Sequence, residues 1–173
     1  MIKKACNILS TVLFLVLAVI AALLLVPNLF GMKAMAVLSG SMAPKIPVGS
    51  IVYVKEAAPD EIREEDVITY AMGSTMVTHR VKEIKETEEQ WITKGDANES
   101  VDGSPVSYEQ LVGKMKFFVP LLGYISIYIK TPLGIAAGCG VLIIMILLTY
   151  LPEILKKEEQ KENKNDLFLG RHK

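Results

Sequence analysis

The chain has 173 residues, of which 51% are hydrophobic and 22% charged, and its 19 basic and 19 acidic residues leave no formal net charge. This balance gives no indication of a nucleic-acid binder, so no nucleic-acid partner is expected. The mean hydropathy of +0.35 is high for a soluble protein. Together with the charged fraction, it favours apolar membrane segments joined to one polar domain.

The first apolar run predicts a membrane-spanning helix over residues 8–32. No residue from 5 to 32 is charged, and about 20 apolar residues are enough to cross the hydrocarbon core of a bilayer. A cleavable signal peptide is the alternative, because Lys3 and Lys4 form a basic start and residues 34–36 (Ala-Met-Ala) resemble a cleavage site. The apolar core of a signal peptide is only about 7–15 residues long. The length of this run therefore favours a retained anchor.

Residues 33–130 predict one small β-rich domain. Segments rich in β-branched and aromatic residues and bounded by turn residues are typical of strands. Four such segments occur, at residues 50–54, 66–72, 76–84 and 90–94. The stretch from Gly95 to Pro105 is rich in Gly, Asp, Asn and Ser and predicts a loop. Fewer than 100 residues are enough for a small β domain but not for a large α/β core.

A second uncharged run, residues 131–152, predicts another membrane helix, with a buried core helix as the alternative. The tail, residues 153–173, is mostly Lys, Glu, Asn and Gln, a composition typical of a solvated, partly disordered end. Four tail lysines lie close behind the second run, namely Lys156, Lys157, Lys161 and Lys164. The positive-inside rule then predicts that residues 1–7 and the tail are cytosolic and that the central domain lies outside.

The central domain contains residue types that could form a nucleophilic site. Ser41 lies in the segment Ser39 to Pro44, whose small residues and proline are typical of a tight loop. Downstream come His79 and then two acids, Asp96 and Asp102, in the predicted loop. A serine needs a base and an orienting acid before it can attack an amide. Both acids also suit ordinary turns, so the sequence leaves open which of them would serve.

Strand periodicity predicts the direction of the His79 side chain. In a strand, alternate residues share one face, so His79 lies with Val77 and Val81, while Arg80 faces the other way with Thr78 and Lys82. A satisfied, half-buried histidine is the alternative to a functional one. With an ordinary pKa of about 6.5, histidine is the side chain best suited to exchange a proton at neutral pH.

The stretch from Ser39 to Val54 resembles the box around the active-site serine of type I signal peptidases. Residues 78–81 (Thr-His-Arg-Val) and 93–98 (Thr-Lys-Gly-Asp-Ala-Asn) are similar to the two boxes that follow, and residues 111–120 extend the similarity. In bacterial-type members the second box carries a catalytic lysine. A histidine at that place, as here, marks the endoplasmic-reticulum-type branch, which includes eukaryotic, archaeal and SipW-like Gram-positive enzymes. The resemblance implies a mainly β fold, a small signal-peptidase-like β domain flanked by two transmembrane α-helices.

The resemblance also implies a role for individual residues. Ser41 matches the nucleophile and His79 the general base. Asp102 falls at the place of the family's triad aspartate and is expected to orient His79, while Asp96 is expected to shape the site or to be the alternative acid. By analogy with the lysine-containing relatives, the Ser39 hydroxyl and the Ser41 backbone N–H would form the oxyanion hole.

The function that the resemblance implies is removal of N-terminal signal peptides from secreted preproteins by acyl-enzyme catalysis at the outer membrane surface. The expected location is the plasma membrane, with both termini cytosolic. The expected partners are preproteins and the lipid bilayer, and accessory subunits are a further option. No cofactor or metal is expected, because no cluster of residues has metal-ligand spacing. Cys6 and Cys139 both lie in apolar runs, so no disulfide framework is expected.

Four other classes fit the sequence less well. A membrane-anchored binding or assembly module would use these residues only in loops and core. An inactive signal peptidase subunit would not need Ser41, His79 and Asp102 together. A zinc metalloprotease would carry a His-Glu-x-x-His helix, and a cysteine-dependent sortase-like enzyme would need a cysteine in the polar domain, whereas both cysteines lie in apolar runs.

Overall fold

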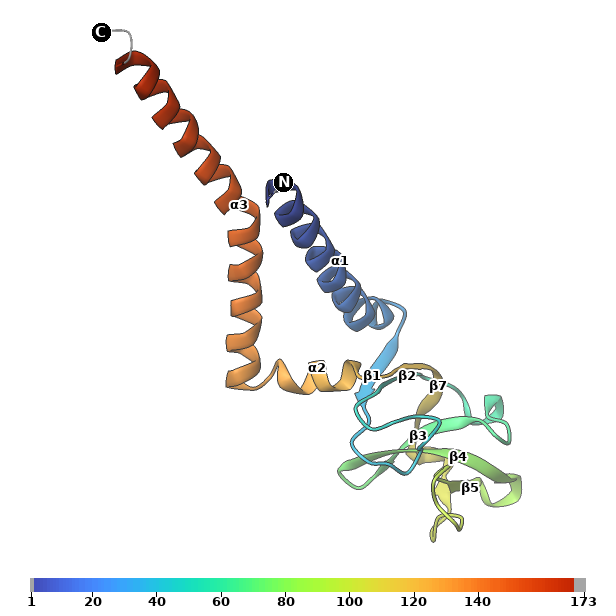
Figure 1. Ribbon diagram of the computed structural model, residues 1–173. Coiled ribbons are helices and arrows are strands. Elements are labelled where there is room, and N and C mark those ends of the chain that lie inside the picture. The colour runs from blue at the N-terminus through green and yellow to red at the C-terminus, as the bar shows by residue number, and fades with distance from the viewer. Residues whose placement is uncertain (1, 170–173) are drawn as a thin grey trace. The chain divides into compact units, whose positions relative to one another are not determined.

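A computed structural model describes residues 2–169 of the chain. Its contacts divide the molecule into two units, a strand-rich unit of residues 22–128 and a helical unit formed by the chain on either side of it. The strand-rich unit holds all seven strands (Figure 1). The predicted fold class, mainly β with two long apolar helices, is confirmed.

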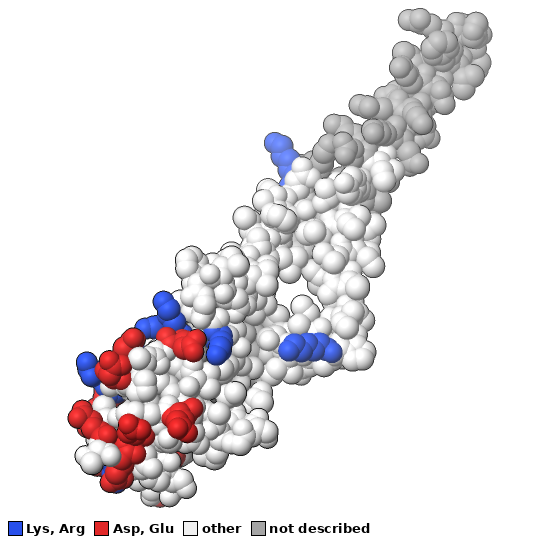
Figure 2. All heavy atoms as spheres, turned by 180° about the vertical axis from the view of Figure 1, so that it is seen from behind, with Lys and Arg blue, Asp and Glu red and all other residues white. Residues whose placement is uncertain are grey.

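Two long helices carry the apolar runs. Helix α1 spans Ile2–Leu29 and helix α3 spans Pro132–Leu169. By length and composition, Lys4–Leu29 and Pro132–Tyr150 are apolar enough to cross a membrane, with mean hydropathies of 3.0 and 2.3, and neither stretch is buried inside the protein. Such exposure is unfavourable in water and favourable in lipid, and on the face drawn in Figure 2 the described parts of these helices are mostly free of charge.

Helix α3 differs from the sequence prediction at its far end. We predict a partly disordered tail after Glu153, but the helix continues to Leu169. The disorder prediction rests on composition, because the tail has too few apolar residues to form a core. Composition alone leaves out two effects that favour a helix. Lys, Glu and Gln have high helix propensity, and the preceding apolar helix removes the cost of nucleation.

The strand-rich unit is built on one antiparallel sheet in the order β1-β2-β7-β3-β4-β5-β6. The strands are β1 Met32–Ala36, β2 Ile51–Lys55, β3 Val67–Met72, β4 Thr75–Lys85, β5 Gln90–Lys94, β6 Val106–Ser107 and β7 Leu111–Val119. Single-turn 3-10 helices lie at Pro59–Glu61, Glu86–Glu88 and Tyr108–Gln110, and helix α2 at Leu122–Tyr128. Register shifts in the pairs β2–β7, β3–β7 and β4–β5 interrupt the ladder, and such irregularities increase the local bend of a sheet.

Four of the seven strands agree with the sequence prediction to within about one residue. The sequence does not predict strand β1, because Met and Ala have little strand propensity and Met32 ends the first apolar run. Strand β6 has two residues, too few for any periodicity. Strand β7 lies within residues 111–120, which the sequence marks only through the family resemblance.

The core of this unit has two parts. One part lies around Trp91, Tyr70 and Ile68, all at most 1% exposed. The other lies around Met42, Ile46 and Val54, also almost fully buried. Met42 and Ile46 come from the loop between β1 and β2, so these two side chains anchor the loop in the core.

Candidate active site

The candidate nucleophile lies in the loop of residues 37–50, which we call the serine loop. The loop is closed at its base, because Val37 N–H donates to the Ser50 carbonyl and Gly49 N–H donates to the Val37 carbonyl, each at 2.9 Å. Met42 and Ile46 point into the core, so the loop cannot rotate as a whole without exposing them. Ser41, next to Met42, is therefore held on a rigid segment while its side chain remains partly exposed.

A second loop supports the main chain of Ser41. Ala97 N–H donates to the Ser41 carbonyl at 2.8 Å. Gly95 lies so close that a Cβ atom placed on it would be 2.6 Å from the same carbonyl oxygen. Such an approach is possible only for a residue without a side chain. The segment Gly95–Asn98 thus fixes the Ser41 backbone from outside the serine loop.

His79 lies on strand β4 with its side chain buried. The residue is 8% exposed, its neighbour Val81 on the same face is fully buried, and Arg80 between them faces ion-pair partners. These exposures confirm the prediction that His79 shares the buried face of the strand with Val81 and that Arg80 faces the other way. Strand β3 pairs with β4 so that Ile68 lies opposite His79, and the Tyr70 ring lies edge-on to the imidazole at 6.4 Å between centroids.

Asp102 is the acid that contacts His79. Its Oδ2 lies 2.6 Å from His79 Nδ1, and both side chains are at most 15% exposed. A carboxylate in its ionised form only accepts hydrogen bonds, so this contact suits the tautomer in which Nδ1 carries the proton and Nε2 is an acceptor. This is the tautomer that a general base needs. Thr93 and Tyr70 also donate to Oδ2, at 2.6 Å and 3.3 Å.

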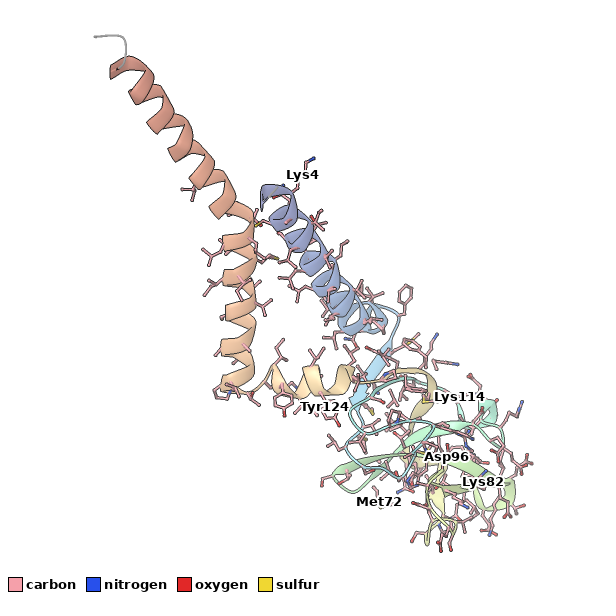
Figure 3. The ribbon with its side chains drawn as sticks, in the orientation of Figure 1. Lys4, Met72, Lys82, Asp96, Lys114 and Tyr124 are labelled. Carbon is pink, nitrogen blue, oxygen red and sulfur yellow. The ribbon has the colours of Figure 1, made fainter. Side chains whose placement is uncertain are left out.

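Asp96 makes a different contact. Arg80 Nε and one terminal nitrogen each donate to the carboxylate of Asp96 at 2.7 Å, and the Asp96 side chain is only 9% exposed. This bidentate hydrogen bonding from Arg80 lowers the pKa of Asp96 below its ordinary value, with smaller contributions from Lys45, at 4.0 Å, and Lys82. Asp96 and Lys82 are both labelled in the strand-rich unit in Figure 3. Asp96 therefore joins strand β4 to the Gly95–Asn98 segment that supports Ser41.

Ser41 and His79 line the same pocket, with a volume of about 400 Å³. Its walls come from β1, the serine loop, Val52 of β2 and the start of β4, and most of their side chains are apolar, including Met35, Val37, Met42, Ile46, Val52 and Val77. Ser39 also lines it, and its Oγ lies 3.3 Å from Ser41 Oγ. The structure thus brings together Ser39, Ser41 and His79 at the pocket, with Asp102 behind the histidine.

These arrangements can be compared with known proteins. No protein-family model matches the chain. Over 120 residues it is 35% identical to signal peptidase I W of Bacillus subtilis (strain 168), a stretch that covers 63% of each protein. The chain resembles a signal peptidase I. The match confirms the resemblance inferred from the three sequence boxes, and the chain spans about 63% of the length of that relative.

Three supporting residues at this site have no signal of their own in the sequence. Arg80 and Thr93 fall within the family-like boxes, and Tyr70 falls within a predicted strand. Alternation along β4 could have indicated that Arg80 lies opposite the buried face. No local pattern could have paired it with Asp96, because that contact depends on a loop beyond strand β5. Within residues 2–169, no group of three or more His, Cys, Asp or Glu residues is placed to hold a metal ion.

The ion pair between Arg80 and Asp96 predicts a pH-dependent contribution to stability. Because Arg80 lowers the folded-state pKa of Asp96 below the unfolded value of about 3.9, this contribution is complete above that value and is lost as the pH falls through the folded pKa. Arg80→Gln is expected to lower the free energy of unfolding by about 3 kcal/mol at pH 7 and to reduce the loss of stability between pH 5 and pH 2.

Urea unfolding in detergent at pH 7, pH 5 and pH 2 measures the free energy of unfolding of each variant. Lys85→Gln is the matched control, because the pair between Lys85 and Glu88 is exposed and longer, at 3.8 Å, and is expected to contribute little. Equal losses of stability in the two variants would contradict the prediction.

Proposed function

We propose that this chain is a membrane-bound serine endopeptidase that removes signal peptides from secreted preproteins. The observation that carries the proposal is the 2.6 Å contact between His79 Nδ1 and Asp102 Oδ2, with His79 and Ser41 lining one pocket. The similarity to signal peptidase I W supports the choice of substrate class. In this proposal Ser41 is the nucleophile, His79 the general base and Asp102 the residue that orients His79.

The mechanism follows from the protonation state of His79. With Nδ1–H donated to Asp102, Nε2 accepts the Ser41 proton while Oγ attacks the scissile carbonyl carbon. The carbonyl oxygen becomes an oxyanion, and the Ser39 hydroxyl and the Ser41 backbone N–H are the proposed donors to it. The imidazolium then protonates the leaving amine, the C–N bond breaks, and an acyl-Ser41 ester remains. Water deprotonated by His79 hydrolyses that ester and restores the serine.

The pocket walls support a peptide substrate with uncharged side chains near the cleaved bond. Met35, Val37, Ile46 and Val77 present apolar surface next to Ser41 and His79, and a charged side chain in such surroundings loses its hydration without gaining a partner. The end of a signal peptide, with small uncharged residues at the positions before the cut, meets this requirement.

The proposed location is the plasma membrane, with residues 33–130 on the outer side and both termini in the cytosol. Two helices long and apolar enough to span a bilayer support a membrane location. The lysines behind the second span support the orientation through the positive-inside rule. Ser41 follows the end of α1 by twelve residues, which supports a site near the surface where a signal peptide leaves the bilayer. The partners are preproteins and lipid, with accessory subunits as a further option.

The proposal is tested by incubating the detergent-solubilised protein with a preprotein that carries an Ala-x-Ala site. We expect one cut after the second alanine, identified from the mass of the product. A folded protein that leaves such preproteins uncut, in detergent and in lipid vesicles, would contradict the proposed function.

The close contact between Gly95 and Ser41 gives a prediction about positioning. Gly95→Ala would place a Cβ atom 2.6 Å from the Ser41 carbonyl oxygen and 2.9 Å from the Asn98 side chain. Because backbone must move to relieve this overlap, Ser41 is displaced, and displacements near 1 Å can cost about 10²-fold in rate. We expect cleavage to fall by about that factor. Gly103→Ala is the control, since nothing lies within 4 Å of its Cβ position. Equal activity in the two variants would contradict the prediction.

A further inference from the structure

The carboxylate of Asp102 has more partners than the histidine. Three donors converge on its Oδ2 atom, namely His79 Nδ1 at 2.6 Å, Thr93 Oγ1 at 2.6 Å and Tyr70 OH at 3.3 Å. Tyr70 OH also lies 3.4 Å from Thr93 Oγ1. Thr93 gives its only hydroxyl proton to the carboxylate, so the single proton of Tyr70 is shared between Oδ2 and the Thr93 oxygen in a three-centre hydrogen bond. The two hydroxyls and the carboxylate oxygen lie at the corners of a triangle.

These two hydroxyls come from buried positions in the sheet. Thr93 lies on β5 and is fully buried, and Tyr70 lies on β3 and is 1% exposed. Strands β3 and β5 flank β4, the strand that carries His79. Asp102, by contrast, lies in the loop before β6, and its backbone N–H donates to the Thr93 carbonyl at 2.8 Å. Thr93 therefore fixes both the main chain and the side chain of Asp102.

We infer that Thr93 and Tyr70 are positioning residues that hold Asp102 in the rotamer in which it orients His79. This inference rests on the proposed peptidase function. A loop carboxylate held by one histidine could rotate away and be solvated. With Thr93 and Tyr70 in place, rotation would leave the buried Thr93 hydroxyl without its acceptor and would break the contact from Tyr70, which is costly. The arrangement makes a single direction of the carboxylate, and hence of the imidazole, the favoured one.

Tyr70 has a second contact that strengthens this role. Its ring lies edge-on to His79, with 6.4 Å between centroids and 72° between planes, so it also limits tilting of the imidazole. Burial raises the pKa of Tyr70 above its ordinary value of 10.0. Tyr70 is therefore a neutral O–H donor at neutral pH.

The test removes each hydroxyl and keeps the side-chain shape. We expect Thr93→Val to lower kcat by about 10–100-fold with little change in KM, because it removes a short hydrogen bond to a charged group. Tyr70→Phe is expected to lower kcat by about 3–10-fold, because its contact is longer. Thr93→Ser, which keeps the hydroxyl, is expected to restore most of the activity.

A spectroscopic readout separates positioning from a general loss of structure. The chain has two histidines, so a His172→Gln background leaves one imidazole, that of His79. In that background the Nδ1–H proton bonded to Asp102 should give a far-downfield NMR resonance, which shifts or broadens in Thr93→Val. Tyr53→Phe is the control, because it removes another buried tyrosine hydroxyl, one bonded to the Leu23 carbonyl. We expect the control to keep both the activity and the resonance.

The outcomes decide the inference separately from the proposed function. Wild-type kcat and an unchanged resonance in both Thr93→Val and Tyr70→Phe would overturn it. So would losses of activity that Thr93→Ser does not restore, or that Tyr53→Phe reproduces. If the wild-type protein cleaves no preprotein, the proposed function fails, and the resonance alone then shows whether Thr93 and Tyr70 hold the pair of Asp102 and His79.

Discussion

Ser41→Ala is expected to abolish preprotein cleavage while leaving the protein folded. In the proposed mechanism, the Ser41 Oγ atom forms the bond to the substrate, and the nearby Ser39 hydroxyl has a different role, as a donor to the oxyanion. Removing such a nucleophile lowers kcat by roughly 10⁴–10⁶-fold. The Ser41 side chain is not part of either core cluster, so thermal stability should change little. Cleavage rates under single-turnover conditions and the unfolding midpoint measure the two effects.

Ser39→Ala is the informative comparison for this variant. Ser39 Oγ is 3.3 Å from Ser41 Oγ, and it is a proposed donor to the oxyanion, whose loss typically costs about 10²–10³-fold. We therefore expect a smaller defect than in Ser41→Ala. Cleavage that survives in Ser41→Ala would remove the serine mechanism. Equal and complete loss in both variants, with both folded, would indicate that Ser39 does more than stabilise the oxyanion.

Asp102→Asn is expected to lower mainly the rate of cleavage, and Asp96→Asn mainly the stability of the protein. In Asp102→Asn the amide no longer holds the Nδ1–H tautomer of His79, so kcat should fall by about 10³–10⁴-fold with nearly normal stability. In Asp96→Asn the bidentate partner of Arg80 is lost, so the main effect should be on stability, with a loss of rate secondary to movement of the Gly95–Asn98 segment. Rates and urea unfolding of both variants, measured side by side, separate the two roles.

The pH dependence of the two variants provides an independent check. In Asp96→Asn the acid-dependent loss of stability linked to Asp96 should disappear, since the lowered pKa of that carboxyl is its cause. In Asp102→Asn this loss should remain. The reverse result, with Asp96→Asn folded normally but catalytically inactive and Asp102→Asn active, would assign the orienting role to Asp96.

Local patterns in the sequence determined the class of the fold and the candidate residues. The two apolar runs, the four strand segments rich in β-branched and aromatic residues, and the loop rich in Gly and Asp are all local features, so each could be predicted without knowing its partners. Alternation along the third of these segments was enough to predict that His79 faces the buried side and Arg80 the other side. The choice of Ser41 and His79 came from short boxes in the sequence and needed no contact between distant segments.

Tertiary structure decided the features that depend on contacts between distant segments. The sequence left open which acid serves His79, and the structure puts Asp102 on the histidine and Asp96 on Arg80. That difference arises because the loop after β5 turns back, so that acids six residues apart reach opposite faces of β4. Strand β1 exists only because β2 offers it a pairing edge, and the Thr93–Tyr70–Asp102 triangle needs a loop to meet two strands. Hydrogen bonds of this kind form only after the chain has folded, so no local periodicity encodes them.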